Sequence, residues 1–284
     1  NISYWNGLYK VDSIPPTIEA DKASSDWYTN AIGDITLSLN EAGSGIQRAV
    51  YSWDLEASSE VGTNFPSNLK VYIPSEGEHV LYLYVKDHAG HEVAWSGTYK
   101  QDTRRPAVSA DKSSSGWKTS EIGPITATAS DLIPGSGINW GISKYSWNGE
   151  PSSNLAENSI LTIPSEGMNR LAISVFDNAL NESTTWVGDY NQDTNAPFLD
   201  ISPRSVGWLG ESPTISLTFE DNVDLFSYKI RKWTSQGWIS SFHGETTTIP
   251  REGKNTLQLS ARDNAGNITD ISHDFYLDLT PPTI

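Results

Sequence analysis

The feature that most constrains the fold is an eight-residue stretch that occurs four times. It runs from Tyr9 through Asp12 to Pro16, and each later copy also places a proline four residues after an aspartate. Successive aspartates are separated by roughly 90 residues, which corresponds to one small domain per interval and not to one turn of a solenoid. The sequence therefore predicts an array whose joints are marked by Asp12, Asp102, Asp193 and Asp278.

These joints divide the chain into three repeats, 13–102, 103–193 and 194–280. Repeats of about 90 residues are long enough for each one to bury a core of its own. Residues 1–12 match the end of a repeat, so we expect them to be the last strand of a preceding one. We expect 281–284 to begin a following repeat and the segment to come from a longer array.

Apolar residues alternate with hydroxyl residues at the same place in every repeat, over 35–39, 125–129 and 215–219. Period-two alternation is typical of a half-buried strand. A Pro-x-Glu-Gly loop follows later, and four residues after its glycine we expect a second alternating strand, with one face toward the core and the other toward water. No apolar stripe has the helical period over ten residues. Short strands separated by turn signals predict an antiparallel β-sandwich in each repeat, with the recurring Trp27, Trp117 and Trp208 as packing anchors.

Further markers keep their order along the repeats. They are Ser-Gly-Ile at 44–46 and 136–138, Tyr-Ser-Trp at 51–53 and 145–147, Glu-Gly at 76–77, and Asp-Asn-Ala-Gly-Asn at 263–267. With them the chain resembles the tandem bacterial immunoglobulin-like (Big-type) repeat domains of cell-surface and secreted proteins and adhesins. The resemblance covers almost the whole chain and implies three immunoglobulin-like sandwiches arranged end to end.

The chain departs from that family pattern at a few positions. The third repeat has Asp221-Asn222-Val223-Asp224 in place of Ser-Gly-Ile, Leu180 stands where glycine is usual, and His88 and His91 stand where asparagine is usual. These departures affect any site that all the repeats would share.

Composition excludes several classes of function. The chain has 19 basic and 35 acidic residues and a net charge of −16, which disfavours nucleic acid as a partner. It has no cysteine, so neither disulfides nor thiolate metal sites hold the repeats. No apolar run reaches the length of a membrane-spanning helix. We find no nucleophile elbow, phosphate loop or His-Glu-x-x-His motif, and we do not expect an enzyme.

Calcium is the cofactor that suits the acidic joints best, although none is required by the sequence. Calcium takes six to eight oxygen ligands, and Asp12, Asp102, Asp193 and Asp278 stand at the joints. Three further aspartates, Asp87, Asp177 and Asp263, would add oxygens if their turns fold toward a joint. The alternative is that the joint aspartates only cap turns ahead of proline.

Two other stretches carry candidate ligand-binding side chains. The loop 87–92 holds His88, His91 and two carboxylates, but its His-x-x-His spacing does not place both rings on one helical face, and a tight turn explains the loop better than zinc. In the third repeat, a basic and aromatic segment predicts a patch for a glycan or an acidic partner. Its residues are Arg231, Lys232, Trp233 and Trp238.

The sequence favours a non-catalytic stalk of an extracellular or bacterial cell-surface protein, a monomeric rod whose partners are the neighbouring repeats. Three units of strands about 25–35 Å long would reach on the order of 100 Å. One alternative is a module that binds a host glycan or protein, most plausibly through the third repeat. A second is an accessory region of a large secreted hydrolase.

Overall fold

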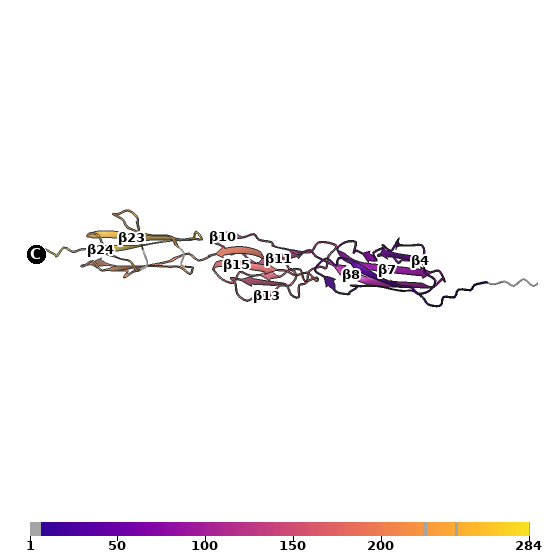
Figure 1. Cartoon of the computed structure of the whole chain (residues 1–284). Coiled ribbons are helices and arrows are strands. Elements are labelled where there is room, and N and C mark those ends of the chain that lie inside the picture. The colour runs from indigo at the N-terminus through magenta and orange to yellow at the C-terminus, as the bar shows by residue number, and fades with distance from the viewer. Residues whose placement is uncertain (1–6, 224–225, 242–243, 284) are drawn as a thin grey trace, which may run out of the picture.

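A computed structural model describes residues 7–223, 226–241 and 244–283. Over these residues the chain is all-β and forms three units that follow one another along one line (Figure 1). Within the described ranges each unit has eight strands, in a three-stranded sheet and a five-stranded sheet. The prediction of three tandem immunoglobulin-like sandwiches is confirmed.

The two sheets have the same strand order in each unit. In the first unit the orders are β1-β3-β6 and β2-β8-β7-β4-β5, and the other units repeat them with numbers raised by eight and sixteen. The strands of the first unit are β1 Thr17–Ala20, β2 Trp27–Tyr28, β3 Ile35–Asn40, β4 Ile46–Trp53, β5 Thr63–Asn64, β6 Lys70–Val71, β7 Gly77–Asp87 and β8 Glu92–Gln101. Those of the second are β9 Ala107–Ala110, β10 Ser115–Lys118, β11 Ile125–Ser130, β12 Lys144–Trp147, β13 Ser153–Asn154, β14 Ile160–Leu161, β15 Gly167–Ser174 and β16 Trp186–Gln192. Those of the third are β17 Phe198–Ser202, β18 Trp208–Leu209, β19 Ile215–Glu220, β20 Phe226–Trp233, β21 Ile239–Ser240, β22 Thr246–Thr247, β23 Gly253–Asp263 and β24 Ile268–Leu277.

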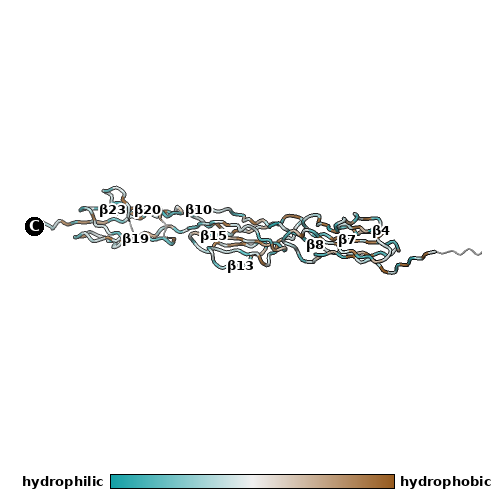
Figure 2. Tube along the Cα trace, in the orientation of Figure 1, coloured by the Kyte–Doolittle hydropathy of each residue, from teal (hydrophilic) through white to brown (hydrophobic). Residues whose placement is uncertain are grey.

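Each core lies between the inward faces of the two sheets. The predicted alternation is seen in β3, where Ile35 and Leu37 are buried and Thr36 and Ser38 are exposed. Hydrophobic and hydrophilic residues interleave along the strands of all three units (Figure 2).

In the last three copies of the repeated stretch, the first aromatic residue is buried in the core of its unit, whereas Tyr9 in the first copy is 83% exposed. Tyr99 is fully buried, packs edge-on against Trp53 at 5.5 Å, and donates its hydroxyl to the carbonyl oxygen of Asp21 at 2.6 Å. Tyr190 and Phe275 are buried at the same place in the other units. Because the aspartate stands three residues later, the packing of this ring fixes where the joint begins.

Two details of the predicted strands are wrong. The sandwich is not wholly antiparallel, because the short strands β2, β10 and β18 pair in parallel with the last strand of their unit. The second alternating strand begins at the glycine itself and not four residues later. Gly77, for example, takes a φ of 113° and already pairs with Gln101, since glycine allows the strand to start directly from the turn.

The outer face of the first unit also differs from the prediction. Tyr84 points away from the core but is only 7% exposed, because residues 54–62 fold over it and Ala57 packs against it. The matching loops, 148–152 and 234–238, are shorter and leave the outer faces of the other units, as far as the structure describes them, uncovered by such a cluster.

Both ends of the described chain lie outside strands. Residues 7–12 and 278–283 form no strand, and 1–6 and 284 lie outside the described residues, so the assignment of 1–12 and 281–284 to neighbouring repeats stays a prediction. Asp224, part of the predicted connection in the third repeat, is also outside them. No helix in the described part of the chain is long and apolar enough to cross a membrane.

Candidate functional site at the joints

The repeated aspartates begin the joints directly after the last strand of each unit. The backbone N–H of Asp102 donates to the carbonyl oxygen of Tyr28 at 3.0 Å, and that of Asp193 donates to the carbonyl oxygen of Lys118 at 2.9 Å. These bonds continue the parallel pairing of the edge strand by one residue. Both aspartates are buried, at 0% and 1% exposure.

The side chain of Asp102 belongs to the second unit, although its backbone ends the first. Its Oδ2 accepts the N–H of Ser136 at 2.7 Å, and its Oδ1 accepts the N–H of Arg104 at 3.1 Å. Asn181 donates its Nδ2 to the carbonyl oxygen of Asp102 and to Oδ2 of Asp177, both at 2.8 Å. The Ser-Gly turn and the Asp-Asn-Ala turn of the second unit therefore hold the end of the first.

The Asp193 joint repeats the asparagine contact. Asn267 donates Nδ2 to the carbonyl oxygens of Asp193 and Asn195 at 2.9 and 3.0 Å, and to Oδ2 of Asp263 at 2.8 Å. The third unit lacks the Ser-Gly turn, and Val223 instead donates its N–H to its own loop residue Asp221 at 3.1 Å. The Asp193 joint therefore keeps the hydrogen bonds from its asparagine, although the third unit has no Ser-Gly turn.

A glutamate from the preceding unit holds the other side of each joint. Glu76 accepts the N–H of Thr103 at 3.1 Å and its hydroxyl at 2.7 Å. Glu166 does the same for Thr194, at 3.0 and 2.9 Å. The Pro-Ser-Glu-Gly markers of the first two repeats are therefore parts of the joints.

Three carboxylates converge at each of the two interdomain joints. Asp102 meets Asp131 and Asp177, and Asp193 meets Asp221 and Asp263, with one ligand oxygen from each residue within 4.8 Å of the other two. Asp131 and Asp221 come from the loops that follow β11 and β19. Each cluster thus joins one carboxylate from the end of a unit to two from the next unit.

Burial, followed by the charges of neighbouring carboxylates, raises the pKa values of two of these aspartates. Burial raises the pKa of Asp131, and the negative charges of Asp102 and Asp177 raise it further. Burial likewise raises the pKa of Asp193, with a contribution from the charges of Asp221 and Asp263. Each cluster brings together three carboxylates, whose negative charges favour binding of a cation.

The donor set at these joints fits calcium. Carboxylate oxygens are the ligands that calcium prefers, and it accepts irregular arrangements of them. Asp102, Asp131 and Asp177 would hold an ion at one joint, and the corresponding three residues at the next. A bound cation there would offset the repulsion among the three carboxylates.

The structure places the predicted joint aspartates unequally. Asp102 and Asp193 lie in clusters with Asp177 and Asp263, as expected if the turns fold toward the joints. Asp278 is exposed, accepts the N–H of Thr280 at 3.0 Å, and belongs to no such cluster among the described residues.

Sequence reasoning missed Asp131 and Asp221. Each follows the first alternating strand of its repeat, and Glu41 stands at the same place in the first repeat. An acidic residue at one position in all three repeats was the signal that could have found them.

The Asp12 joint has a different composition. Asp12, Asp87 and His91 come together there, so that a histidine stands where the other joints have asparagine. Hydrogen bonds from the N–H of Ile14 and from Ser44 lower the pKa of Asp12 to about 2. Burial by itself raises the pKa of Asp87, but the hydrogen bonds and charge of His91 outweigh it and lower that pKa below its usual range.

The predicted ligand-binding set in the third unit is only partly on the surface. Trp233 is 1% exposed and donates Nε1 to the hydroxyl of Thr247 at 3.1 Å, so its assignment to a ligand platform is wrong. The alternation of β20 turns this ring into the core beside Phe275. Arg231 forms a half-buried ion pair with Glu245 at 2.6 Å.

Lys232 and Trp238 remain available on the outer face of the third unit. The Lys232 ammonium lies 4.6 Å from the centre of the Trp238 ring, which is 45% exposed. Another exposed aromatic pair lies on β18 and β24 of the same sheet. The Trp208 ring is 66% exposed, and its centre lies 5.5 Å from that of Tyr276 with the two planes tilted by 53°. The interpretation of Trp208 as a buried packing anchor is therefore also wrong.

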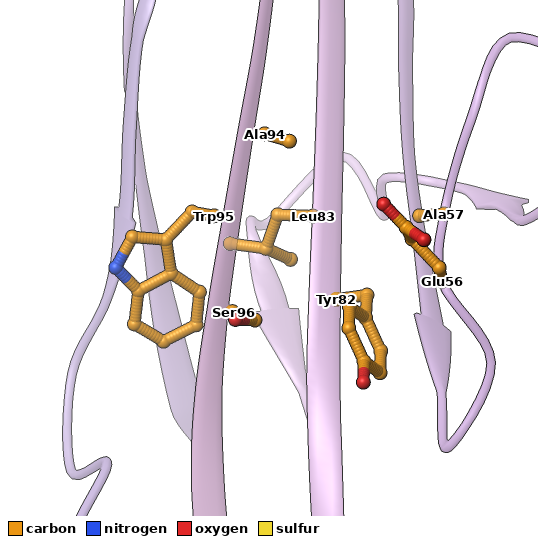
Figure 3. Close-up of a pocket in the computed structure, with 7 residues that line it drawn as sticks. All are labelled: Glu56, Ala57, Tyr82, Leu83, Ala94, Trp95 and Ser96. Atoms are coloured by element: carbon orange, nitrogen blue, oxygen red, sulfur yellow. The ribbon is translucent and has the colours of Figure 1, made fainter.

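A small hollow lies beneath the long loop of the first unit. It has a volume of about 140 Å³ and is lined by side chains that include Glu56, Tyr82 and Ser96. The side chains of Glu56 and Tyr82 lie near each other, and that of Trp95 extends away from them (Figure 3). Ligand pockets commonly have volumes of about 300 Å³ or more, so this hollow is too small for a sugar or a peptide.

Neither a family model nor a curated protein sequence matches the chain. Several solved structures do. One is the tetra-tandem repeat in the extending region of a large adhesion protein, with 15% identity, a TM-score of 0.45, and coverage of 93% of this chain and 74% of that one. Another is the sialic acid binding region of a Streptococcus sanguinis SK1 adhesin bound to 3'sLn, with 13% identity, a TM-score of 0.24, and coverage of 94% and 78%.

A third similar structure is the protocadherin gammaB7 EC3-6 cis-dimer, with 14% identity, a TM-score of 0.32, and coverage of 90% of this chain and 73% of that one. All three likenesses concern the fold alone. Their identities are too low to transfer a ligand or an activity.

Proposed function

We propose that this chain is a non-catalytic spacer of a bacterial cell-surface or secreted adhesin-like protein, which holds other modules of that protein apart. The observation that carries the proposal is that, at both interdomain joints, side chains of the preceding unit and of the following unit form hydrogen bonds to the connecting segment, and that these bonds repeat from one joint to the next. Asn181 and Asn267 bind the joint from the following unit, while Glu76 and Glu166 bind it from the preceding one. The sequence features that recur most strictly therefore serve the joints.

Small-angle X-ray scattering of the whole chain tests this proposal. We expect the scattering of an extended rod, and replacement of both joint asparagines, N181A with N267A, should broaden the distribution of lengths. Asn178→Ala is the matched control, because the Asn178 side chain bonds to Ser136 of its own unit and not across the joint. A compact or freely hinged particle in the unsubstituted chain would contradict the spacer function.

We further propose that calcium stiffens the Asp102 and Asp193 joints. The support is the convergence of three carboxylates at each joint and the raised pKa values of Asp131 and Asp193. A ligand that binds only the folded state stabilises it by about 2.7 kcal/mol at one hundred times its Kd. Melting in calcium should therefore occur several degrees above melting in chelator, and D131N should remove the part of this gain that comes from its joint. Equal melting temperatures in calcium and chelator would refute the calcium site.

A second candidate function is glycan binding by the third unit. It is favoured by the exposed ring of Trp208 beside Tyr276, since exposed aromatic faces on a rigid sheet suit sugar rings. Screening of the chain on a glycan array, followed by W208A, tests it. A hit that survives W208A unchanged would place the binding elsewhere, and no hit would leave only the spacer function.

A further inference from the structure

The Asp12 joint differs from the other two joints by a set of histidines. The first repeat has His79, His88 and His91 at three positions where the second and third repeats both have asparagine. The asparagines are Asn169, Asn178 and Asn181 in the second repeat, and Asn255, Asn264 and Asn267 in the third. Two of the three histidines, His88 and His91, lie in the turn that packs on the joint.

His91 is held in place by a carboxylate. Its Nδ1 lies 2.7 Å from Oδ2 of Asp87, and its backbone N–H donates to Oδ1 of the same residue at 2.8 Å. Asp87 is fully buried and its carboxylate can only accept, so the proton of a neutral His91 ring lies on Nδ1. Among the described residues Nε2 makes no hydrogen bond. A carboxylate on one ring nitrogen is the arrangement that orients histidines in metal sites.

Asp12 completes the cluster from the segment that precedes the first strand of the unit. One ring nitrogen of His91 and one oxygen each of Asp12 and Asp87 lie within 4.8 Å of one another. Ser44 donates its N–H to Oδ2 of Asp12 at 2.6 Å, and Ile14 donates to Oδ1 at 3.0 Å. These bonds hold the Asp12 carboxylate in position.

A cavity of about 640 Å³ lies on the Asp12 side of the cluster. Asp12 and His88 both line it, together with Lys10 and Ser44. The Asp12 carboxylate lies so close to the backbone of Gly43 that only glycine fits there, because a Cβ at that position would lie 2.3 Å from the carboxylate. An ion entering the cavity therefore meets the oxygen of Asp12 and finds a second imidazole on the wall.

We propose that the Asp12 joint binds a divalent transition-metal ion, with Asp12 and Nε2 of His91 as ligands, Asp87 orienting the His91 ring, and His88 on the wall of the adjoining cavity. Imidazole nitrogen suits zinc, copper and nickel, whereas carboxylate oxygen alone suits calcium and magnesium. The Asp102 and Asp193 joints offer aspartate and asparagine groups at the same positions. The chain therefore carries two chemically different kinds of joint. This site is separate from the spacer function, which holds whether or not the metal binds.

Calorimetric titration of the whole chain with Zn²⁺ tests the proposal. We expect H91N to weaken the highest-affinity site at least tenfold, and D12N to do the same. H91N gives this joint the residue that the other two units already carry, so its fold should be retained, which circular dichroism can verify. Calcium binding at the other joints should be unchanged in H91N.

His79→Asn is the matched control. His79 also lies 2.7 Å from an aspartate, Asp54, and also replaces an asparagine of the other repeats, but it belongs to none of the three clusters found among the described residues. We expect H79N to keep the zinc affinity of the unsubstituted chain. The reverse exchange, N181H, should create a second zinc site at the Asp102 joint. The proposal is overturned if the chain binds no zinc, or if H91N and H79N lower the affinity equally.

Discussion

Single tryptophans in this chain have opposite roles according to the strand face on which they lie. Trp233 fills the core of the third unit and uses its ring nitrogen on Thr247, whereas Trp208 stands 66% exposed on an edge strand of the same unit. Both belong to series that recur in each repeat. Recurrence of a residue type therefore does not establish burial.

The two tryptophans give a paired test of stability. We expect W233A to cost about 3–5 kcal/mol, because it leaves a large cavity and an unpaired Thr247 hydroxyl. W208A should change stability by no more than about 0.5 kcal/mol, as for other surface sites. Denaturant unfolding of the third unit measures both. Similar losses for the two variants would mean that Trp208 is part of the packed structure.

The raised pKa of Asp193 makes the stability of the folded chain depend on pH. The pKa of Asp193 is raised in the folded chain, so the folded state binds this proton more tightly than the unfolded state does. Its contribution to stability is present below the unfolded pKa, about 3.9, and is lost as pH rises through the raised folded value.

Asp193→Asn isolates this contribution. In chelator, D193N should melt at a temperature close to that of the unsubstituted chain at pH 4 and above it at pH 7. In calcium the order at pH 7 should reverse, because the variant lacks one ligand. Thermal melts at the two pH values provide the measurement. If the difference in melting temperature between D193N and the unsubstituted chain did not change with pH, burial and the neighbouring charges would not be raising the pKa of Asp193.

At the scale of elements, the loop after β11 packs tightly against the joint and places Asp131 beside Asp102. Gly135 has no room for a side chain, since a Cβ there would lie 2.4 Å from the carbonyl oxygen of Leu132 and 3.2 Å from Oδ2 of Asp102. The Arg104 guanidinium also bonds to this loop, at the carbonyl oxygens of Leu132 and Pro134. The loop is thus fixed by both units.

Replacement of this glycine should loosen the joint. We expect G135A to cost about 1–3 kcal/mol, the usual range for overpacking a close contact, and to weaken calcium binding at the Asp102 joint. Gly116→Ala in the same unit is the control, because a Cβ there meets nothing within 4 Å. Melting and calcium titration of both variants supply the comparison, and an unaffected G135A would mean that the loop can move without loss.

Elements also show which parts of the site the sequence could predict. Period-two alternation identified β3, β11 and β19, because burial of one face leaves that signal directly in the order of residues. The convergence of Asp102 with Asp131 could not be derived in this way, since it depends on how two units meet. The burial of Trp233 was also beyond a local pattern, because the basic residues around it suggested an exposed strand.

Over the whole molecule, the two interdomain joints are more uniform than the outer faces of the units. Glu76 and Glu166 bind their joints alike, while the outer face of the first unit is covered by 54–62 and that of the third exposes Trp208 and Trp238. Uniform joints with varied faces suit a spacer whose units can acquire separate contacts.

The parallel pair in each unit determines how the chain would respond to tension. Force applied along the rod pulls β2 toward its N-terminal end and β8 toward its C-terminal end, and parallel strands pulled in this way slide past each other. Their hydrogen bonds are then loaded in shear and must break together, whereas a hairpin pulled at its open end unzips one bond at a time. The two bonded pairs, Trp27 with Lys100 and Tyr28 with Gln101, are extended by the bond from Asp102 to Tyr28. Asp102, Asp193 and Asp278 each make this bond, and each thereby lengthens the mechanical clamp of the unit that precedes it.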